Sequence, residues 1–436
     1  MGFGFFCGKK YKLSIEFIRL VMKIYKFGGA SVKDAAAVKN VTSIIGRCDG
    51  RKIVVVSAMA KMTNTFEALV EAYFEGNTKI VFELFETIKE FHHTLIKELM
   101  GQADAVPRFN NFIALLEARL KCIPTSHFDF EYDQIVPFGE LLSTSIVAAY
   151  INKSGILCEW VDGRDLIKTD DTYRDANVDW TLTAQKINEK LTFEAAGCYL
   201  IQGFIGGTEN NRSTTLGREG SDYSAAILGH VLDAKSVTIW KDVPGVLNAD
   251  PRWYDKAVKI DELSYNEAIE LSFYGAQVIH PKTLKPLQNK EIPLWVKSFL
   301  NPLEAGTVIH SRIGISQPVP VYIRKTNQIF VTISPRDFSF IMEEKLIEII
   351  SLFYHHRIKM NLMQNSALNF SACFDANRST PELFDALKSQ FVVRYNEAVE
   401  LITIRQYTPE AIASMTNGRV ILDSQVTRKV ARFILQ

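Results

Sequence analysis

The 436-residue sequence lacks the features that mark membrane-spanning, disulfide-stapled or nucleic-acid-binding proteins. It contains no run of 18 apolar residues, which excludes an ordinary transmembrane helix. Its six cysteines are scattered, with no CxxC pair and no Cys/His cluster at zinc spacing, so we expect neither a disulfide framework nor a metal site. This cysteine usage predicts a reducing, cytoplasmic environment. The charges nearly cancel (50 Lys+Arg against 49 Asp+Glu), which argues against nucleic acid as the main partner.

The length predicts more than one folding unit. The chain is about three times as long as a usual single domain, and hydrophobic residues make up 47% of it, enough for well-buried cores. Residues 1–21 form an N-terminal extension in which apolar MGFGFF precedes basic KKYK, the reverse of the order in a signal peptide. We interpret it as a mis-assigned start or a disordered tail, with a targeting or docking tail as the alternative.

Residues 22–310 carry the pattern of a layered α/β domain. Apolar, β-rich runs (KIYKFGG, KIVVVSAM, CYLIQGFIGG, SVTIWKDV, IPLWVKS) alternate with segments of helical period, which is typical of βαβ units. The strands end in Gly, Ser or Asp, at the edge where open α/β sheets bind ligands. The stretch from Phe66 to Phe128 has few glycines and predicts a helical insert.

The sequence changes character near residues 301–320, where Gly and Pro recur without a periodic pattern. We therefore place a domain boundary there. Residues 318–436 predict a βαββαβ order, the α+β sandwich of ferredoxin-like modules. Two further strands, RVILDSQ and KVARFILQ, leave no room for a complete second copy.

Four segments carry residues suited to phosphate and carboxylate chemistry. In the first, Lys26 precedes Gly28, Gly29 and Ser31, which places a cation beside a loop whose amides can approach phosphate, although a strand-end turn would have the same composition. In the second, Arg218 suits a bidentate contact with a carboxylate, and Ser221 and Asp222 open a helix. Here the alternative is that Ser221 or Asp222 is only a helix cap.

The third segment runs from Trp240 to Arg252 and would gather two cations and two carboxylates in one loop, which suits a nucleoside triphosphate and its magnesium, or else a plain surface turn. In the fourth, PFGELLS, Glu140 opens an apolar helix, a position where a carboxylate is also common for structural reasons.

Taken together, these segments resemble the aspartate kinases of the amino-acid kinase superfamily. The motifs KFGGAS, VSAMAKMTN, PFGELLS, GFIGG, TTLGREGSDYSAA, KDVPGVLNADPR and GAQVIHP match in order and span residues 23 to about 310. The resemblance implies an amino-acid kinase fold followed by a regulatory ACT module. It also implies ATP-dependent phosphorylation of the 4-carboxylate of L-aspartate to L-4-aspartyl phosphate, at the entry to lysine, threonine and methionine synthesis, with Mg²⁺ carried by the nucleotide.

The resemblance also implies residue roles. Lys26 would stabilise the transferring phosphoryl group, and Asp222 would hold the lysine and magnesium geometry. The expected aspartate-binding residues are Ser57, Thr63, Glu140, Arg218, Gly220 and Ser221. The expected nucleotide-binding residues are Gly28, Gly29, Ser31, Lys241, Asp242, Leu247, Arg252, Gln277 and Val278. No protein metal ligands are expected.

The sequence departs from the family pattern at four positions within these motifs. Gln277 replaces a common lysine, Lys241 a threonine, Glu219 a glycine or asparagine, and Leu247 a tyrosine. We expect Lys241 to supply the charge missing at position 277, and Glu219 to weaken dicarboxylate binding unless it points away.

The regulatory region leaves the effector open. ACT modules usually pair, so the resemblance predicts a homodimer or a larger homo-oligomer, with lysine or threonine as hypothetical effectors. However, the segment SPRDFSF lacks the glycine usual before the sensing helix. Two alternatives remain: a kinase of another small acid, such as glutamate or acetylglutamate, and a catalytically weakened kinase that acts as an ACT-domain amino-acid sensor.

Overall fold

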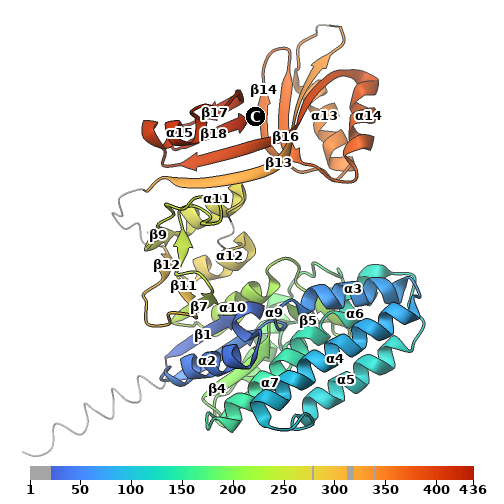
Figure 1. Cartoon of the computed structure of the whole chain (residues 1–436), viewed down its shortest axis with the longest axis vertical. Helices are drawn as coiled ribbons and strands as arrows, with labels where there is room; N and C mark the ends of the chain where they lie inside the picture. Colours follow the sequence, from blue (N-terminus) through green and yellow to red (C-terminus); the bar gives the residue numbers. More distant parts are fainter. Residues whose placement is uncertain (1–20, 277–278, 312–318, 338) are drawn as a thin grey trace, which may run out of the picture. The chain divides into compact units, whose positions relative to one another are not determined.

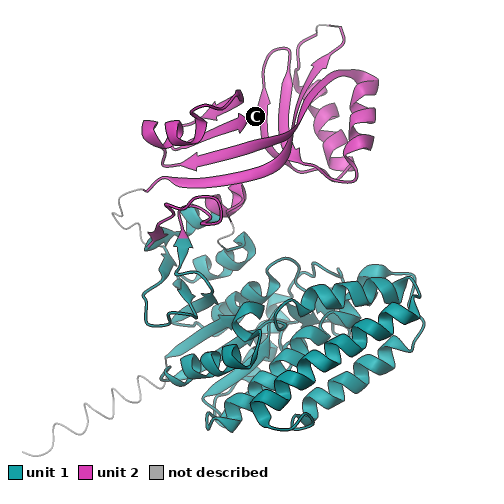
Figure 2. Ribbon diagram, viewed as in Figure 1, with its two compact units in different colours: residues 1–246, 261–269, 278–314 teal, residues 247–260, 270–277, 315–436 magenta. Residues whose placement is uncertain are grey.

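The computed structural model describes residues 21–276, 279–311, 319–337 and 339–436. These form two compact units, each interrupted in sequence (Figure 2). Unit 1 comprises residues 1–246, 261–269 and 278–314, and unit 2 comprises residues 247–260, 270–277 and 315–436. Of the predicted N-terminal extension, only residue 21 lies within the described residues.

Unit 1 is built on an eight-stranded sheet with the order β10-β12-β11-β7-β1-β2-β4-β3. Figure 1 labels its strands β1, β4, β7, β11 and β12. Six of its strands, which run from β11 to β3 in that order, are parallel, and β12 pairs antiparallel with β11. From β1 the chain moves to β2 on one side and later to β7 on the other, so β1 lies at the point where the strand order reverses. The strands are β1 (Met22–Phe27), β2 (Arg51–Val56), β3 (Cys158–Val161), β4 (Cys198–Gln202), β7 (Ser236–Lys241), β10 (Glu262–Ser264), β11 (Leu294–Ser298) and β12 (Thr307–His310).

Helices cover both faces of this sheet. A Cβ on Gly229 would contact Ile24 and Val237, which places α10 on their face. Phe27 instead shares a core cluster with Val38 and Val41 of α2, on the other face. The helices of this unit outside the insert are η1 (Gly29–Val32), α2 (Ala35–Gly46), α7 (Phe138–Lys153), α8 (Gly163–Leu166), α9 (Trp180–Lys190), α10 (Gly220–Val231) and α12 (Pro281–Asn289). The residues of α11 (Tyr265–Tyr274) are divided between the two units. A short hairpin, β5 (Ile205–Gly207) with β6 (Ser213–Thr215), precedes α10.

The helical insert expected between Phe66 and Phe128 is present. It consists of α3 (Met62–Phe74), α4 (Thr78–Met100), α5 (Pro107–Leu120) and α6 (Phe128–Ile135), which join one hydrophobic core with α2 and α7 (Figure 1). The continuous stretch Phe128–Lys153 is long and apolar enough to cross a membrane by composition alone. However, 78% of its apolar window is buried inside unit 1, which is the pattern of a core helix.

Unit 2 contains a six-stranded antiparallel sheet with the order β14-β15-β13-β16-β18-β17. The predicted βαββαβ order is present as β13 (Val321–Pro335), α13 (Glu343–His355), β14 (Met360–Asn365), β15 (Phe370–Asp375), α14 (Thr380–Gln390) and β16 (Phe391–Arg405). The predicted fold class, a layered α/β domain followed by a C-terminal ferredoxin-like region, is therefore confirmed. The short strand β9 (Lys259–Ile260) belongs to unit 2, and its partner β8 (Val246–Leu247) begins at the last residue before the chain enters this unit.

The remainder of unit 2 reuses two strands of this module. β13 and β16 each have 15 residues, and their pairing shifts register between Lys325 and Phe330. Beyond that shift, residues 321–325 and 399–405 continue the sheet with β18 (Val430–Leu435) and β17 (Ile421–Val426), covered by α15 (Pro409–Thr416). The incomplete second copy thus shares its strands with the first.

Candidate functional site

The candidate site lies at the carboxyl edge of the parallel strands in unit 1. Lys26 is the penultimate residue of β1, Ser57 follows β2, Gly203 follows β4 and Lys241 ends β7. Because these four strands are parallel neighbours, their carboxyl ends meet at one edge of the sheet. Residues from four distant parts of the sequence are thereby brought together.

An ion pair between Lys26 and Asp222 forms the centre of this edge. The Lys26 Nζ lies 2.7 Å from Asp222 Oδ1, and the two side chains are only 13% and 5% exposed. Asp222 Oδ1 accepts no hydrogen bond from the described residues, so its contact with Lys26 is an ion pair alone. Since α10 begins at Gly220 and has no side-chain cap, the interpretation of Ser221 or Asp222 as a helix cap is wrong. Asp222 is directed instead at the cation of β1.

Glu219 occupies the N-cap position of α10 in a left-handed conformation (φ 55°). A non-glycine residue is strained there, so other contacts must hold it in place. Its Oε2 accepts a hydrogen bond of 2.8 Å from the backbone N–H of His280, which precedes α12. This carboxylate therefore has a structural partner at the start of α12.

Two serines connect β2 to the start of α10. The Ser57 hydroxyl donates to the Ser221 Oγ over 2.9 Å, and the Ser143 hydroxyl donates to the Ser57 carbonyl over 2.7 Å. Gly203 packs against this connection so closely that an added Cβ would lie 2.4 Å from the Ser221 Cβ. The position of Ser221, and of Asp222 beside it, therefore depends on a residue without a side chain at 203.

Glu140 brings a second carboxylate to the site from the first turn of α7. It is buried, and its Oε1 accepts a hydrogen bond from the Ala58 N–H over 3.1 Å. Its Oε2 has no hydrogen-bond partner. Burial raises the pKa of Glu140 to about 8, against the lowering effects of the Ala58 N–H and the Lys26 charge. A buried carboxylate with one free oxygen suits a ligand cation.

The glycine loop after β1 is shaped by close backbone contacts. A Cβ on Gly29 would lie 2.6 Å from the Ala60 carbonyl oxygen, and one on Gly28 would lie 3.4 Å from Lys26 Nζ. The Ser31 hydroxyl is buried and donates to the Gly28 carbonyl over 2.9 Å, which stabilises the loop itself. Thr63 lies in the first turn of α3.

The remaining predicted residues take no part in the Lys26–Asp222 ion pair. Arg218 is exposed and makes no hydrogen bond or ion pair with another residue in the described ranges. Asp242 is exposed after β7. Leu247 and Arg252 belong to unit 2, where the Arg252 Nε donates to Asp250 over 2.9 Å. Gln277 and Val278 lie outside the described residues, so the expected compensation by Lys241 stays a prediction.

Sequence analysis missed a carboxylate that organises the β5–β6 hairpin. Asp133 of α6 is buried and accepts hydrogen bonds from the Thr215 N–H (2.9 Å), the Thr215 hydroxyl (2.8 Å) and the Arg174 N–H (3.0 Å). Burial raises the pKa of Asp133 to about 6. Its only sequence signal is an acid on the buried side of an amphipathic helix, with no motif around it.

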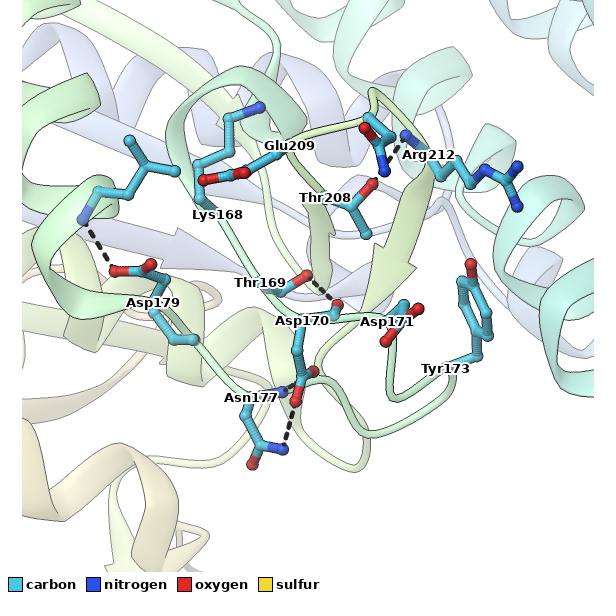
Figure 3. Close-up of a pocket in the computed structure, with 13 residues that line it drawn as sticks. Lys168, Thr169, Asp170, Asp171, Tyr173, Asn177, Asp179, Thr208, Glu209 and Arg212 are labelled. Carbon is cyan, nitrogen blue, oxygen red and sulfur yellow. Dashed lines mark hydrogen bonds between the residues drawn. The ribbon is translucent and has the colours of Figure 1, made fainter.

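A pocket of about 720 Å³ lies beside that hairpin (Figure 3). Two of its carboxylates are held by neighbouring groups: Asp170 accepts from Asn177 (2.9 and 2.8 Å), and Asp179 accepts from the Leu182 N–H of α9 (2.9 Å). Four carboxylates and two cations line the pocket, so its lining does not favour an anion. None of the predicted site residues lines it. In the described part of the chain, no three His, Cys, Asp or Glu side chains cluster as a metal site would require.

Comparison with known proteins identifies the class to which this site belongs. The model of the amino acid kinase family matches residues 22–298, which is more than half of the chain. The chain therefore belongs to the amino acid kinase family.

Within that family, the chain belongs with the aspartokinases. It is 30% identical over 368 residues to lysine-sensitive aspartokinase 3 of Escherichia coli, covering 82% of this chain and 79% of that protein. It is 34% identical over 296 residues to bifunctional aspartokinase/homoserine dehydrogenase 1 of Arabidopsis thaliana, covering 66% of this chain but only 32% of that protein. The chain thus spans about a third of the length of the bifunctional relatives.

Solved structures show the same likeness. The structure of E. coli aspartokinase III in complex with lysine and aspartate (T-state) matches with a TM-score of 0.80 and 26% identity, covering 95% of this chain and 96% of that one. The complex of the same enzyme with aspartate and ADP (R-state) matches with a TM-score of 0.78 and the same identity and coverage.

Proposed function

We propose that this protein is an aspartate kinase, which transfers the γ-phosphoryl group of ATP to the 4-carboxylate of L-aspartate and releases ADP and L-4-aspartyl phosphate. The observation that carries this proposal is the buried Lys26–Asp222 ion pair beside Glu140, whose free oxygen would receive the α-ammonium group of an amino acid. The ADP and aspartate named in the E. coli complex support the same pair of substrates.

Lys26 and Asp222 would act on the phosphoryl group through charge. A phosphoryl transfer needs little covalent chemistry from the protein, so catalysis depends on positioning and on neutralising charge on the equatorial oxygens. Lys26 would supply that positive charge, and Asp222 would hold the ammonium group of the Lys26 side chain in place. The acceptor carboxylate is already ionised at neutral pH, so no general base is required.

The aspartate-binding residues would hold both ends of the substrate. Glu140 would take the α-ammonium group, and Arg218 a carboxylate, since its guanidinium is exposed without a protein partner among the described residues. Ser57 and Ser221 would offer their hydroxyls, and Thr63 and Gly220 complete the proposed set by motif. The hydrogen bond between Ser57 and Ser221 and the contact of Glu140 with the Ala58 N–H support this assignment.

The nucleotide would approach the same edge along the glycine loop and the end of β7. We assign Gly28, Gly29, Ser31, Lys241, Asp242, Leu247, Arg252, Gln277 and Val278 to its binding by motif. Mg²⁺ would arrive on the ATP phosphates and neutralise their charge. The exposed Asp242 carboxylate and the ion-paired Asp222 are chemically suited to face such an ion.

We further propose residues 22–310 as the catalytic region and residues 318–436 as a regulatory region. The lysine named in the E. coli T-state complex supports an amino-acid effector, lysine or threonine, for this chain too. Pairing of ferredoxin-like regions would make the protein a homodimer or larger homo-oligomer, and its scattered cysteines support a reducing, cytoplasmic location. A flat response of activity to both amino acids would leave the region a purely structural role.

The test is acceptor-dependent ADP formation by the full chain. Aspartate, glutamate, acetylglutamate and uridylate are supplied in parallel, with a reaction lacking acceptor as the background. We expect turnover with aspartate alone, lost in Asp222→Ala and retained in Asp104→Ala, a control that removes an exposed carboxylate. Turnover with another acceptor, or none in folded protein, would contradict the proposal.

A further inference from the structure

A pocket of about 400 Å³ in unit 1 lies on the opposite face of the sheet from Lys26. Tyr25 lines it, and successive strand residues project to opposite faces, so Lys26 points away from it. α10, which carries Asp222, packs on the Ile24 and Val237 face. The pocket is therefore separate from the candidate kinase site. Its principal lining side chains are Lys23, Tyr25, Arg47, Trp240, Trp295 and Lys297.

The charge of this pocket has one sign. Lys23, Arg47 and Lys297 line it, and no carboxylate does. None of these three cations forms an ion pair with a carboxylate in the described ranges, and the neighbouring Glu304 is exposed and does not line the pocket. Burial lowers the pKa of Lys297. The pocket in Figure 3 has more acidic than basic lining residues, whereas three cations without a counter-charge favour an anion here.

Aromatic rings form the wall beside these cations. The rings of Tyr25 and Trp240 meet edge to face, with centroids 5.8 Å apart. The Trp240 ring also stacks on the Phe27 ring, with centroids 5.9 Å apart. The Lys297 Nζ lies 5.5 Å from the centre of the Trp240 ring. Trp295 of β11 is half-buried. Rigid rings of this kind offer a flat apolar surface at little entropic cost.

We propose that this pocket binds a small organic anion that carries a flat aromatic ring. The ring would lie against the aromatic wall, and the anionic group would be held by Lys23, Arg47 and Lys297. The pocket volume lies in the range of small-molecule sites. An aryl carboxylate and a nucleoside phosphate share this chemistry. The site is independent of the kinase activity proposed above.

Calorimetric titration of the full chain with matched probes tests this. 2-Naphthoate and 2-naphthyl phosphate share a ring and differ in the anionic group, 2-naphthol has the ring without charge at neutral pH, and inorganic phosphate has the charge without the ring. We expect both naphthyl anions to bind with one-to-one stoichiometry, about tenfold or more tighter than naphthol or phosphate. Whichever of 2-naphthyl phosphate and 2-naphthoate binds more tightly, the result supports the proposal and identifies the preferred anionic group.

Variants locate the binding. The double variant Lys23→Gln/Lys297→Gln should weaken binding of the naphthyl anions by about tenfold, and Trp295→Leu should weaken it by about fivefold. Lys39→Gln, which removes an exposed lysine of α2, and Asp222→Ala, which disables the kinase site, should leave it unchanged. Thermal melting verifies that each variant folds. Absence of binding by both naphthyl anions, or equal binding by the double variant, would overturn the proposal.

Discussion

If Glu140 binds aspartate as proposed, its protonation state should make that binding depend on pH. With a pKa of about 8, the buried carboxyl group is mostly protonated at pH 7 before the substrate binds. In the proposed site it would have to ionise to receive the α-ammonium group of aspartate. The free-energy cost of ionisation is about 1.4 kcal/mol at pH 7 and about 0.4 kcal/mol at pH 8. Aspartate should therefore bind about fivefold more weakly at pH 7 than at pH 8.

Calorimetry in two buffers of different ionisation enthalpy measures this directly. Binding at pH 7 should release about 0.9 proton, and at pH 9 about 0.1 proton. In Glu140→Gln the release and the rise of affinity between pH 7 and pH 8 should disappear, and affinity at pH 8 should fall because the ammonium loses its counter-charge. The reasoning is refuted if wild type releases no proton at pH 7, or if the variant keeps the wild-type pH dependence.

Three further results are expected. Gly203→Ala should lower kcat/KM for aspartate by up to about a hundredfold, because its Cβ would lie 2.4 Å from that of Ser221; Gly197→Ala, with no atom within 4 Å, is the matched control for steady-state kinetics. Ser221→Ala removes the partner of Ser57 and should raise KM by about fivefold while kcat changes less, as the same assay would show. Because the folded-state pKa of Glu140 is raised, folded protein binds more protons than unfolded protein between about pH 5 and pH 8, so its Tm should fall over this interval and fall less in Glu140→Gln.

The individual helices and strands could largely be predicted from the sequence, because each has its own hydrophobic period and ends at residues typical of turns. The apolar strands around Lys26 and Ser57 end in small residues, and the helical insert predicted between Phe66 and Phe128 is present. The predicted βαββαβ order of the C-terminal region is also present. Such signals are local, since propensity and hydrophobic periodicity act over one element at a time.

Contacts between distant residues could not be predicted in the same way. The hydrogen bond of Asp133 to Thr215 joins residues 82 positions apart, and nothing in the sequence around either residue indicates it. The sharing of β13 and β16 by both halves of the C-terminal sheet depends on a register shift near Gln328. The eight-residue helix α15 was missed because so short a segment carries little periodic signal. Motif resemblance assigned Lys26 and Asp222 to the same site, but only the structure distinguishes their ion pair from a helix cap.

The most direct test of the account is to trap the reaction product. An acyl phosphate reacts with hydroxylamine, so aspartate kinase activity should yield aspartyl hydroxamate in an amount equal to the ADP formed. Wild type and Lys39→Met should produce it at the same rate, whereas Lys26→Met should lose about a hundredfold to a thousandfold in kcat. Equal hydroxamate formation by Lys26→Met, or ADP formation without hydroxamate in wild type, would contradict transfer of a phosphoryl group to aspartate at the Lys26–Asp222 site.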